Sequence, residues 1–232
     1  MDISPINMKR IYQSIIGQFI ELIKDGKLKV GEKLPPERSL AEMFKVSRAS
    51  IREAFSAMEI IGLIEVRPGE GSFITDLNIG PFISTISPLL VTNESMETDL
   101  LDFRMLIEIE AVKLATVKSD ENGHVLLQNT LSKMDEAVRK NNIVLGAEAD
   151  IEFHKTIFNL TGNYILIKAA ECTAYLLESS VKFNRSKILK NEKNSKVLLD
   201  QHTEIFNAIK LRNEQEAVEI MNRHLSFVRE IS

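Results

Sequence analysis

Residues 34–74 read LPPERSLAEMFKVSRASIREAFSAMEIIGLIEVRPGEGSFI, and this stretch decides the fold of the N-terminal part of the chain. The prolines at 35 and 36 cannot continue a preceding helix but can occupy the first turn of a new one, so we expect a short helix through Phe44. A tight turn follows, in which Ser47 can cap a second helix that runs from Arg48 to about Ile61.

The second helix has one apolar face and one basic face. Its apolar residues recur at helical spacing and are expected to point inward: Ile51, Ala54, Phe55, Met58 and Ile61. Arg48 and Arg52 lie one turn apart on a different face. A helix that presents two guanidinium groups outward suits the major groove of DNA.

A glycine-tipped hairpin is expected directly after this helix. Gly62 can end the helix in a left-handed conformation, and strand-like segments follow at 63–66 and 72–75 around the sequence RPGEG. Helix, turn, helix and hairpin in this order predict a winged helix, whose second helix enters a DNA groove while the hairpin tip reaches phosphate or the minor groove. The alternative is a small helical subdomain with a solvated basic face, which any single part of the pattern allows.

The composition fits two modest domains. The chain has 232 residues, of which 44% are hydrophobic. Its net charge of -4 gives no sign of nucleic-acid binding, but residues 24–52 contain eight basic and four acidic side chains, and a phosphate backbone responds to this local balance. Cys172 is the only cysteine, which excludes an intrachain disulfide and a thiolate zinc cluster. Because no leader and no bilayer-length apolar run occur, we expect a cytoplasmic protein with no membrane partner.

The N-terminal residues resemble the GntR family of bacterial transcription regulators. The family signature is matched in order by GKLKVGEKLPPERSLA at 26–41, VSRASIREA at 46–54, GLI at 62–64 and GEG at 69–71. The resemblance implies a winged helix whose DNA contacts come from Arg38, Ser47, Arg48, Arg52 and Gly69. One departure is Pro36, where the family often has a serine that caps the helix, so capping is in question there while the fold is not.

From Thr98 onward, almost every long segment has helical periodicity. The expected helices cover 98–118, 123–141, 143–160, 164–189, 194–211 and 214–231, and another amphipathic helix is expected at 8–24. The predicted fold class is therefore mainly α: a winged helix-turn-helix with a small β-hairpin wing, followed by an all-α antiparallel helical bundle. The expected domains are 1–76 for the winged helix, 77–93 for a linker with a connecting helix from Phe82 to Val91 that Pro88 interrupts, and 94–232 for the bundle.

Three of the four histidines lie on helices that can converge inside such a bundle. Asp150 and His154 are four residues apart on one helix, so their side chains point the same way, while His202 and His224 lie on the last two helices. Three imidazoles and one carboxylate suit a divalent ion such as zinc, nickel or manganese, with positions left open for a small carboxylate when the ion takes more than four ligands. The alternative treats each histidine as a separate core or surface residue, and spacing alone does not choose.

The C-terminal segments are similar to FCD, the helical ligand-binding domain of the FadR-like branch of the GntR family. The similarity rests on DFRMLIE at 102–108, DIEFH at 150–154, TGN at 161–163 and the segments around the last two histidines. It implies an effector-binding and dimerisation domain whose divalent metal ion is held by Asp150, His154, His202 and His224. It also implies a small organic acid as effector. The complete quartet argues against the metal-free, acyl-CoA-binding variant of the branch, which lacks these residues.

Four other polar residues of this region need an interpretation. Arg104 matches an arginine on the first FCD helix and can hold an organic acid's carboxylate through a bidentate fork, whereas the alternative is an ion pair with Glu108, one turn on. Glu108 and Glu110 are expected on a solvated or interhelical face. We expect His124, at a helix start, to be a surface residue and not a fifth ligand.

Together these features predict a ligand-responsive transcription regulator that binds a palindromic double-stranded DNA operator as a homodimer. One rival is a metal-dependent hydrolase, since a histidine-rich centre can activate water. No HExxH pattern occurs, however, and no general base can be placed because Asp150 is already assigned as a ligand. A second rival is a regulator with a purely structural metal, in which the coordination is closed. The sequence does not choose between repression and activation.

Overall fold

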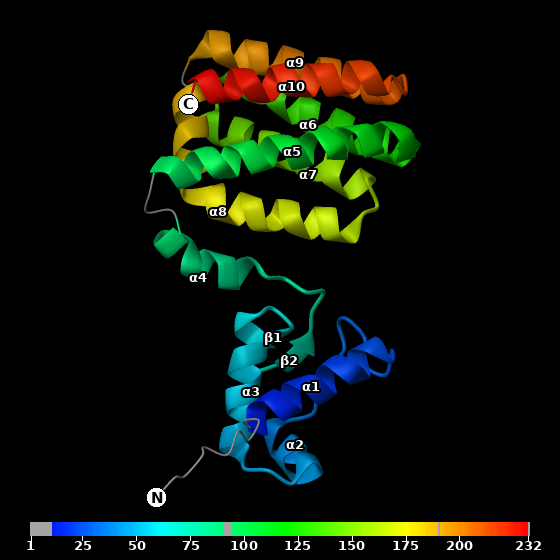
Figure 1. Cartoon of the computed structure of the whole chain (residues 1–232), viewed down its shortest axis with the longest axis vertical. Helices are drawn as coiled ribbons and strands as arrows, with labels where there is room; N and C mark the ends of the chain where they lie inside the picture. The colour runs from blue at the N-terminus through cyan, green and yellow to red at the C-terminus, as the bar shows by residue number, and fades with distance from the viewer. Residues whose placement is uncertain (1–10, 91–93, 190, 232) are drawn as a thin grey trace, which may run out of the picture. The chain divides into compact units, whose positions relative to one another are not determined.

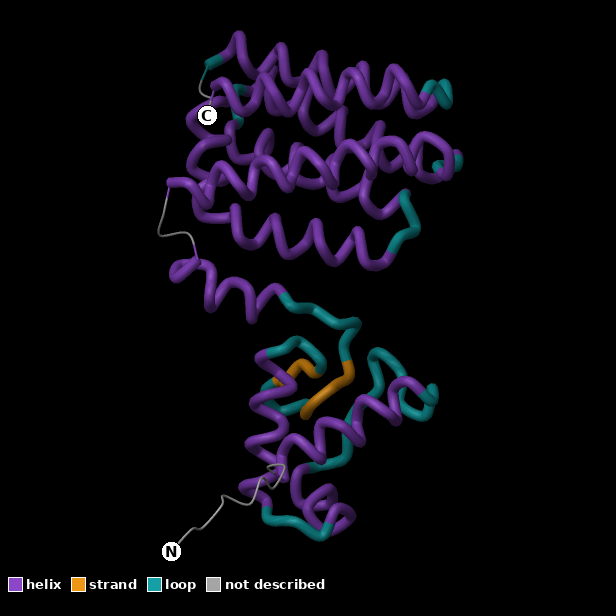
Figure 2. Tube along the Cα trace, viewed as in Figure 1, coloured by secondary structure: helices purple, strands orange, loops and turns teal. Residues whose placement is uncertain are grey.

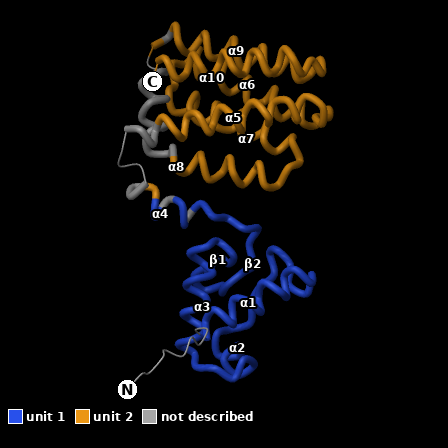
Figure 3. Tube along the Cα trace, in the orientation of Figure 1, with its two compact units in different colours: residues 1–86 blue, residues 87–232 orange. Residues whose placement is uncertain are grey.

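The computed structural model describes residues 11–90, 94–189 and 191–231, and the chain forms two compact units, residues 1–86 and 87–232 (Figure 3). In the described ranges, ten helices accompany a single two-stranded sheet (Figures 1 and 2). The expected mainly α fold, with a small hairpin and a helical bundle, is confirmed. Residues 8–10 and 91, at the ends of two expected helices, lie outside the described residues.

The first unit is a winged helix. Its elements are α1 (Ile11–Lys24), α2 (Glu37–Phe44), α3 (Arg48–Ile60), β1 (Ile64–Arg67) and β2 (Gly71–Ile74). The two strands pair antiparallel, with Ile64 opposite Ile74 and Arg67 opposite Gly71. Both strands lie within one residue of the segments predicted for them, because the alternating pattern and the glycine-containing turn are local properties of the sequence.

The core of this unit comes from the apolar face of α3. Ile51, Ala54 and Met58 are fully buried, and the rings of Phe55 and Phe19 of α1 form a T-shaped pair with 6.2 Å between their centroids. The prediction that Ile61 points inward is wrong, because 37% of this residue is exposed. The helix ends at Ile60, so the helical period does not extend to the next residue.

Helix ends in the first unit follow the chemistry of their capping residues. Ser47 caps α3 as predicted, and its Oγ accepts a hydrogen bond from the amide of Ser50 at 3.1 Å. Pro36 at the start of α2 provides no side-chain cap, in line with its departure from the family pattern. Gly62 has φ +69° after α3, a conformation that disfavours residues with a side chain.

Helix α4 (Gly80–Leu90) contains the boundary between the two units. The expected interruption at Pro88 is wrong, since the helix continues to Leu90. A proline in the last turn removes one backbone hydrogen bond without preventing the helical backbone conformation.

The second unit is an all-helical bundle. Its helices are α5 (Glu94–Lys118), α6 (Glu121–Lys140), α7 (Ile143–Leu160), α8 (Tyr164–Leu189), α9 (Glu192–Lys210) and α10 (Glu214–Ile231). Helix α7 packs against α5, α6 and α8, while α10 packs against α5 and α9 (Figure 1). The packed core is rich in apolar side chains, among them the fully buried Phe153, Ile205 and Met221.

An arginine in the turn between the last two helices of the bundle contacts the end of α5. Arg212, in the turn between α9 and α10, has φ +55°. Its guanidinium donates to the carbonyl oxygens of Thr116 at 3.2 Å, Val117 at 2.5 Å and Ser119 at 2.8 Å, all at the end of α5. The last carbonyls of a helix lack partners within that helix, so the guanidinium supplies donors to Thr116 and Val117 in the last turn of α5, and its charge complements the helix dipole. The α9–α10 turn is thereby attached to the end of α5.

Candidate metal centre and DNA-binding surface

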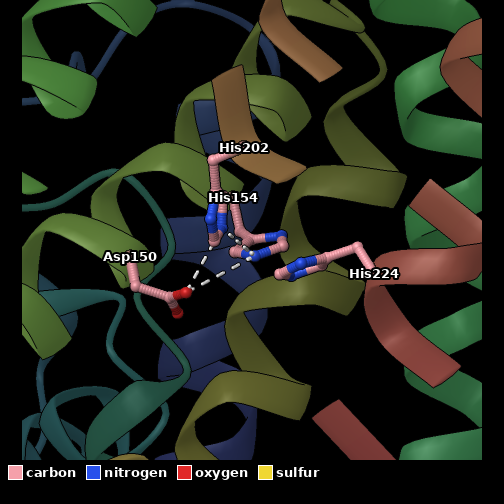
Figure 4. A group of neighbouring side chains, drawn as sticks. All are labelled: Asp150, His154, His202 and His224. Atoms are coloured by element: carbon pink, nitrogen blue, oxygen red, sulfur yellow. Dashed lines mark hydrogen bonds and ion pairs between the residues drawn. The ribbon is translucent and has the colours of Figure 1, made fainter. Parts of the chain in front are cut away.

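The structure brings the four predicted metal ligands together inside the second unit. Asp150 and His154 project from α7, His202 from α9 and His224 from α10, and the side chains point toward one another (Figure 4). One nitrogen or oxygen atom from each residue lies within 4.8 Å of the others. The three histidines are buried, and the aspartate is partly buried. The set therefore spans three helices, which converge as the sequence analysis considered possible.

Individual distances show how tightly the ligand atoms converge. The Nε2 atom of His202 lies 3.3 Å from Nε2 of His154 and 3.3 Å from Oδ1 of Asp150. The Nε2 atom of His154 is 3.9 Å from the same carboxylate oxygen. These separations are short enough for a single cation to contact all of these atoms.

The opposite nitrogen of each imidazole meets a hydrogen-bond acceptor. Nδ1 of His202 is 2.6 Å from the carbonyl oxygen of Leu198, and Nδ1 of His224 is 3.0 Å from Oε1 of Gln201. Nδ1 of His154 bonds to Oε2 of Glu108. Because these partners accept, each Nδ1 carries the hydrogen, a tautomer that we infer from the partner atoms. Each Nε2 then presents a lone pair to the centre of the cluster.

Burial favours the neutral form of two imidazoles. It lowers the pKa of His154, although the Glu108 carboxylate acts in the opposite direction. Burial also lowers the pKa of His224 well below its usual value, and His202 and His154 add to that shift. Nε2 of His224 is buried and, among the described residues, has no hydrogen-bond partner. Neutral imidazoles with free Nε2 lone pairs are the form that binds a metal ion.

Glu108 is buried between helices. Of the two surroundings expected for it, a solvated face and an interhelical face, the structure shows the second. Its Oε1 accepts a hydrogen bond from Nε of Arg104 at 2.5 Å, and Oε2 meets His154. Burial alone would raise the pKa of Glu108, but Arg104 and His154 outweigh it and hold the pKa well below its usual range. The Arg104–Glu108 pair is thus present, while Glu110 is exposed.

A cavity of about 390 Å³ reaches the cluster from one side. Its wall includes Asp150 and His202, together with Asn142 at the start of α7 and the cationic side chains Arg139 and Lys196. Among the described side chains that line it, Arg104 is absent. The cavity can admit a small polar molecule to the Asp150 and His202 side of the cluster.

His124 is neither a surface residue nor a member of the cluster. Only 12% of its side chain is exposed, its ring packs edge-on against Phe206, and its Nε2 lies 3.2 Å from the hydroxyl of Ser119. The surface prediction is therefore wrong. The helix-start position of His124 indicated exposure, but the ring folds back against α9.

Sequence reasoning named Glu108 only as an alternative partner of Arg104 and did not consider Gln201. The oxygens of these two side chains meet Nδ1 of His154 and of His224. Gln201 directly precedes His202, and Glu108 lies 46 residues before its histidine partner. Only the general rule that metal-binding histidines use their second nitrogen for an acceptor could have suggested such partners. It does not identify them.

The residues predicted to contact DNA lie on α2, α3 and the hairpin of the first unit. Arg38, Arg48 and Arg52 are exposed, as is Ser47 at the start of α3. Arg52 forms an ion pair with Glu37 at 2.8 Å, and Arg38 pairs with Glu42 at 3.3 Å. For Arg48, the described part of the chain offers no side-chain partner. Gly69, with φ +78°, lies in the turn between β1 and β2.

A winged helix on the same chain as a helical domain that contains a buried histidine and aspartate cluster defines a class: DNA-binding regulators with a separate sensing domain. Comparison with known protein families identifies both parts of the chain. Residues 11–74 match the family described as bacterial regulatory proteins, gntR family, and residues 99–227 match the FCD domain. The chain belongs to the GntR family of transcription regulators and has an FCD domain.

Relatives support this assignment along most of the chain. The HTH-type transcriptional regulator LutR of Bacillus subtilis is 31% identical, with 90% of this chain and 95% of the relative covered. The Glc operon transcriptional activator of Escherichia coli is 30% identical, with 93% of this chain and 86% of the relative covered. A solved structure, Streptococcus agalactiae GntR, has a TM-score of 0.75 at 24% identity, covers 95% of this chain and all of its own, and supports the fold. The helices of the described ranges include none with the length and apolarity to span a bilayer.

Proposed function

We propose that this transcription regulator is a homodimer that senses a small organic acid through a divalent ion held by Asp150, His154, His202 and His224. The observation that carries the proposal is the convergence of ligand atoms from three histidines and one aspartate in one largely buried cluster, at which the inferred tautomers direct the Nε2 lone pairs. Lone pairs and negative charge repel each other unless a cation lies between them. The donor set fits zinc, nickel or manganese.

The ion's chemistry and the cavity together support an acid as the effector. A bound divalent ion attracts carboxylates and hydroxyl oxygens, and protein ligands that leave positions open allow such a molecule to coordinate. Lys196 in the cavity wall adds positive charge along the approach to Asp150 and His202, while Arg139, also in the wall, is paired with Asp135 at 2.9 Å. A purely structural metal would not need this access.

Arg104 remains a second proposed contact for the acid's carboxylate. Its Nε is engaged by Glu108, and no further side-chain partner of its guanidinium is found in the described ranges, which leaves donors for a carboxylate. Arg104 does not line the described cavity, so an acid held there would reach it only by a further approach.

The proposed DNA contacts are those of a winged helix bound to a palindrome. Arg48 and Arg52 on α3 reach base edges or phosphates, Arg38 and Ser47 contact the backbone nearby, and Gly69 lies at the wing tip. A single recognition helix reads few base pairs, so two copies related by two-fold symmetry are required for a specific operator. The acid changes operator affinity only if it binds one arrangement of the dimer better than another.

Elemental analysis tests the metal site. Protein purified without added metal or chelator should contain about one divalent ion per chain, and the His154→Ala, His202→Ala double variant should contain none. His124→Ala is the matched control, because this histidine is mostly buried in the same unit but outside the cluster. Wild-type protein that holds no ion even after incubation with zinc, nickel or manganese would overturn the metal proposal.

Operator titrations test the sensing role. Genomic fragments selected by the full-length protein serve as the DNA, and a panel of short hydroxy acids and dicarboxylates serves as the probe. We expect at least one of these acids to change the affinity for DNA by roughly 5- to 150-fold, the usual range of coupling between two sites, and only when metal is present. Unchanged affinity for every acid in metal-loaded protein would support a structural metal instead.

A further inference from the structure

A continuous line of buried polar contacts connects Arg104 on α5 to the metal-site histidine on α7. Arg104 donates from Nε to one oxygen of Glu108, and the other oxygen of Glu108 meets Nδ1 of His154. The exposed fractions of these side chains are 10% for Arg104, 4% for Glu108 and 7% for His154. Water therefore has little access to replace any of these contacts.

The contact with Glu108 determines which nitrogen of His154 faces the cluster. A carboxylate without its proton only accepts hydrogen bonds, so Nδ1 must donate and Nε2 must keep its lone pair. The same bond holds the plane of the ring. Nε2 of His154 is then directed to the point that also receives Nε2 of His202, 3.3 Å away.

His154 differs from the other two histidines in the charge of its partner. His202 donates to a backbone carbonyl and His224 to the neutral amide of Gln201, whereas His154 donates to a carboxylate. A hydrogen bond to a charged acceptor is stronger, and it increases the electron density at the opposite nitrogen of the ring. Among the three, His154 is the imidazole whose Nδ1 partner is a charged side chain.

We infer that Glu108, held in place by Arg104, is a positioning residue that fixes the tautomer and orientation of His154 for metal binding. This inference rests on the proposed metal site and assigns two further residues to it. Arg104 has a defined task here even without an effector, because it neutralises a buried carboxylate and engages the oxygen that His154 does not use. The pair would set the affinity of the protein for its ion.

Metal affinity of the apo-protein, measured by competition with a chromophoric chelator, tests the inference. Glu108→Gln should bind zinc about 10- to 100-fold more weakly than the wild type, the usual effect of removing such a partner. Glu110→Gln is the matched control, since it changes an exposed carboxylate two residues away on the same helix and should bind zinc as the wild type does. Equal affinity of Glu108→Gln and wild type would overturn the inference.

The tautomer of His154 is a second test, and it can be measured in the wild-type protein even when the Glu108→Gln variant does not fold. Long-range proton–nitrogen NMR spectra of apo wild-type protein distinguish the two nitrogens of each imidazole, and the loss of one signal set in His154→Ala assigns them. We expect a hydrogen on Nδ1 of His154. A hydrogen on Nε2 would contradict the positioning role even if Glu108→Gln were too unstable to study.

Arg104→Gln separates positioning from direct binding of the acid. If Arg104 acts through Glu108, this variant should bind zinc several-fold more weakly in the absence of any acid. Zinc affinity equal to that of the wild type, with only acid binding weakened, would show that Arg104 does not act on the metal site. Wild-type protein that binds none of zinc, nickel and manganese would overturn both this inference and the proposed function, whereas normal zinc binding by Glu108→Gln would overturn this inference alone.

Discussion

The two units of this protein place their functional side chains in opposite surroundings. In the first unit, Arg48 and Arg52 on α3 are exposed to water, and in the second unit the three histidines of the cluster are buried. An exposed cation acts at a distance, is screened by salt and needs no partner. A buried polar group must have its hydrogen bonds completed by neighbouring side chains or the backbone. The DNA-binding surface can therefore be changed one residue at a time, whereas the cluster responds as a group.

Ion pairs show the same contrast. Arg52 and Glu37 lie 2.8 Å apart with 73% and 38% of their side chains exposed, and such a pair can open when a phosphate replaces the carboxylate. The Arg104–Glu108 pair is buried, and removal of either partner leaves an uncompensated charge in the protein interior. Similar residue types are thus proposed to serve recognition in one unit and positioning in the other.

Removal of the metal ion should produce the largest difference between the units. When free ion is present at 1,000 times its dissociation constant, binding to the folded state stabilises it by about 4 kcal/mol. We expect EDTA to lower the unfolding temperature of the second unit by several degrees without changing that of the first, as measured by calorimetry. The His154→Ala, His202→Ala variant should show no response to EDTA, and an equal response of both units would contradict the assignment of the site to the bundle.

A pair of glycine substitutions compares the backbone of the two units. An added Cβ at Gly62 would lie 1.7 Å from the carbonyl oxygen of Asn78, and φ is +69°. At Gly162, φ is +59° but nothing lies within 4 Å of the added atom. We expect Gly62→Ala to destabilise the first unit by about 3 kcal/mol or more, and Gly162→Ala to destabilise the second by about 1 kcal/mol. Equal losses in chemical denaturation would show that the turn at Gly62 yields without strain.

The sequence predicted the first unit well because its determinants are local. Ser47 caps the helix that begins at the next residue, and Gly62 has the positive φ predicted at the helix end. Patterns of a few residues contain this information. Ile61 was assigned wrongly because the helical period gives no position at which the helix ends.

The helices of the second unit were predicted, and the family resemblance implied its four candidate ligands, but neither indicated the side chains that surround these four residues. The sequence separations of 46 residues between Glu108 and His154 and of 95 between Arg212 and Val117 leave no local pattern. Such contacts depend on how the helices pack, and periodicity reports only which face of each helix is apolar. His124 was misplaced for the same reason, since its burial comes from α9.

Substitution of the exposed arginines should affect DNA binding and leave the fold unchanged. We expect Arg48→Ala and Arg52→Ala each to weaken operator binding by about 10- to 100-fold if the side chain contacts a base edge. Loss of a phosphate contact would instead weaken binding to all DNA sequences similarly. It would also reduce the slope of log affinity against log salt concentration by about one. Arg223→Ala is the control, because it removes an exposed, paired arginine from the other unit. Wild-type affinity in both α3 variants would refute the assignment of this helix to the groove.

The smallest expected effect concerns Ser47, which caps α3 and is also proposed to contact DNA. The hydroxyl oxygen of Ser47 accepts a hydrogen bond from the backbone N–H of Ser50 at 3.1 Å. At the start of α7, the side-chain oxygen of Asn142 accepts a hydrogen bond from the backbone N–H of Leu145 at 3.1 Å. Loss of such a cap costs about 1 kcal/mol, so Ser47→Ala and Asn142→Ala should lower protection from hydrogen exchange by similar amounts in α3 and α7.

The two capping positions should differ once DNA is present. Aspartate caps a helix as well as serine does, so Ser47→Asp should restore the protection of α3 that Ser47→Ala loses. Its charge would nevertheless face the phosphates that Ser47 is proposed to contact, so operator affinity should fall further than in Ser47→Ala. Asn142→Asp should keep the α7 cap and leave operator affinity of the effector-free protein unchanged. If Ser47→Asp recovered both stability and DNA binding, Ser47 would serve the helix alone, and the proposed contact with the operator would have to be withdrawn.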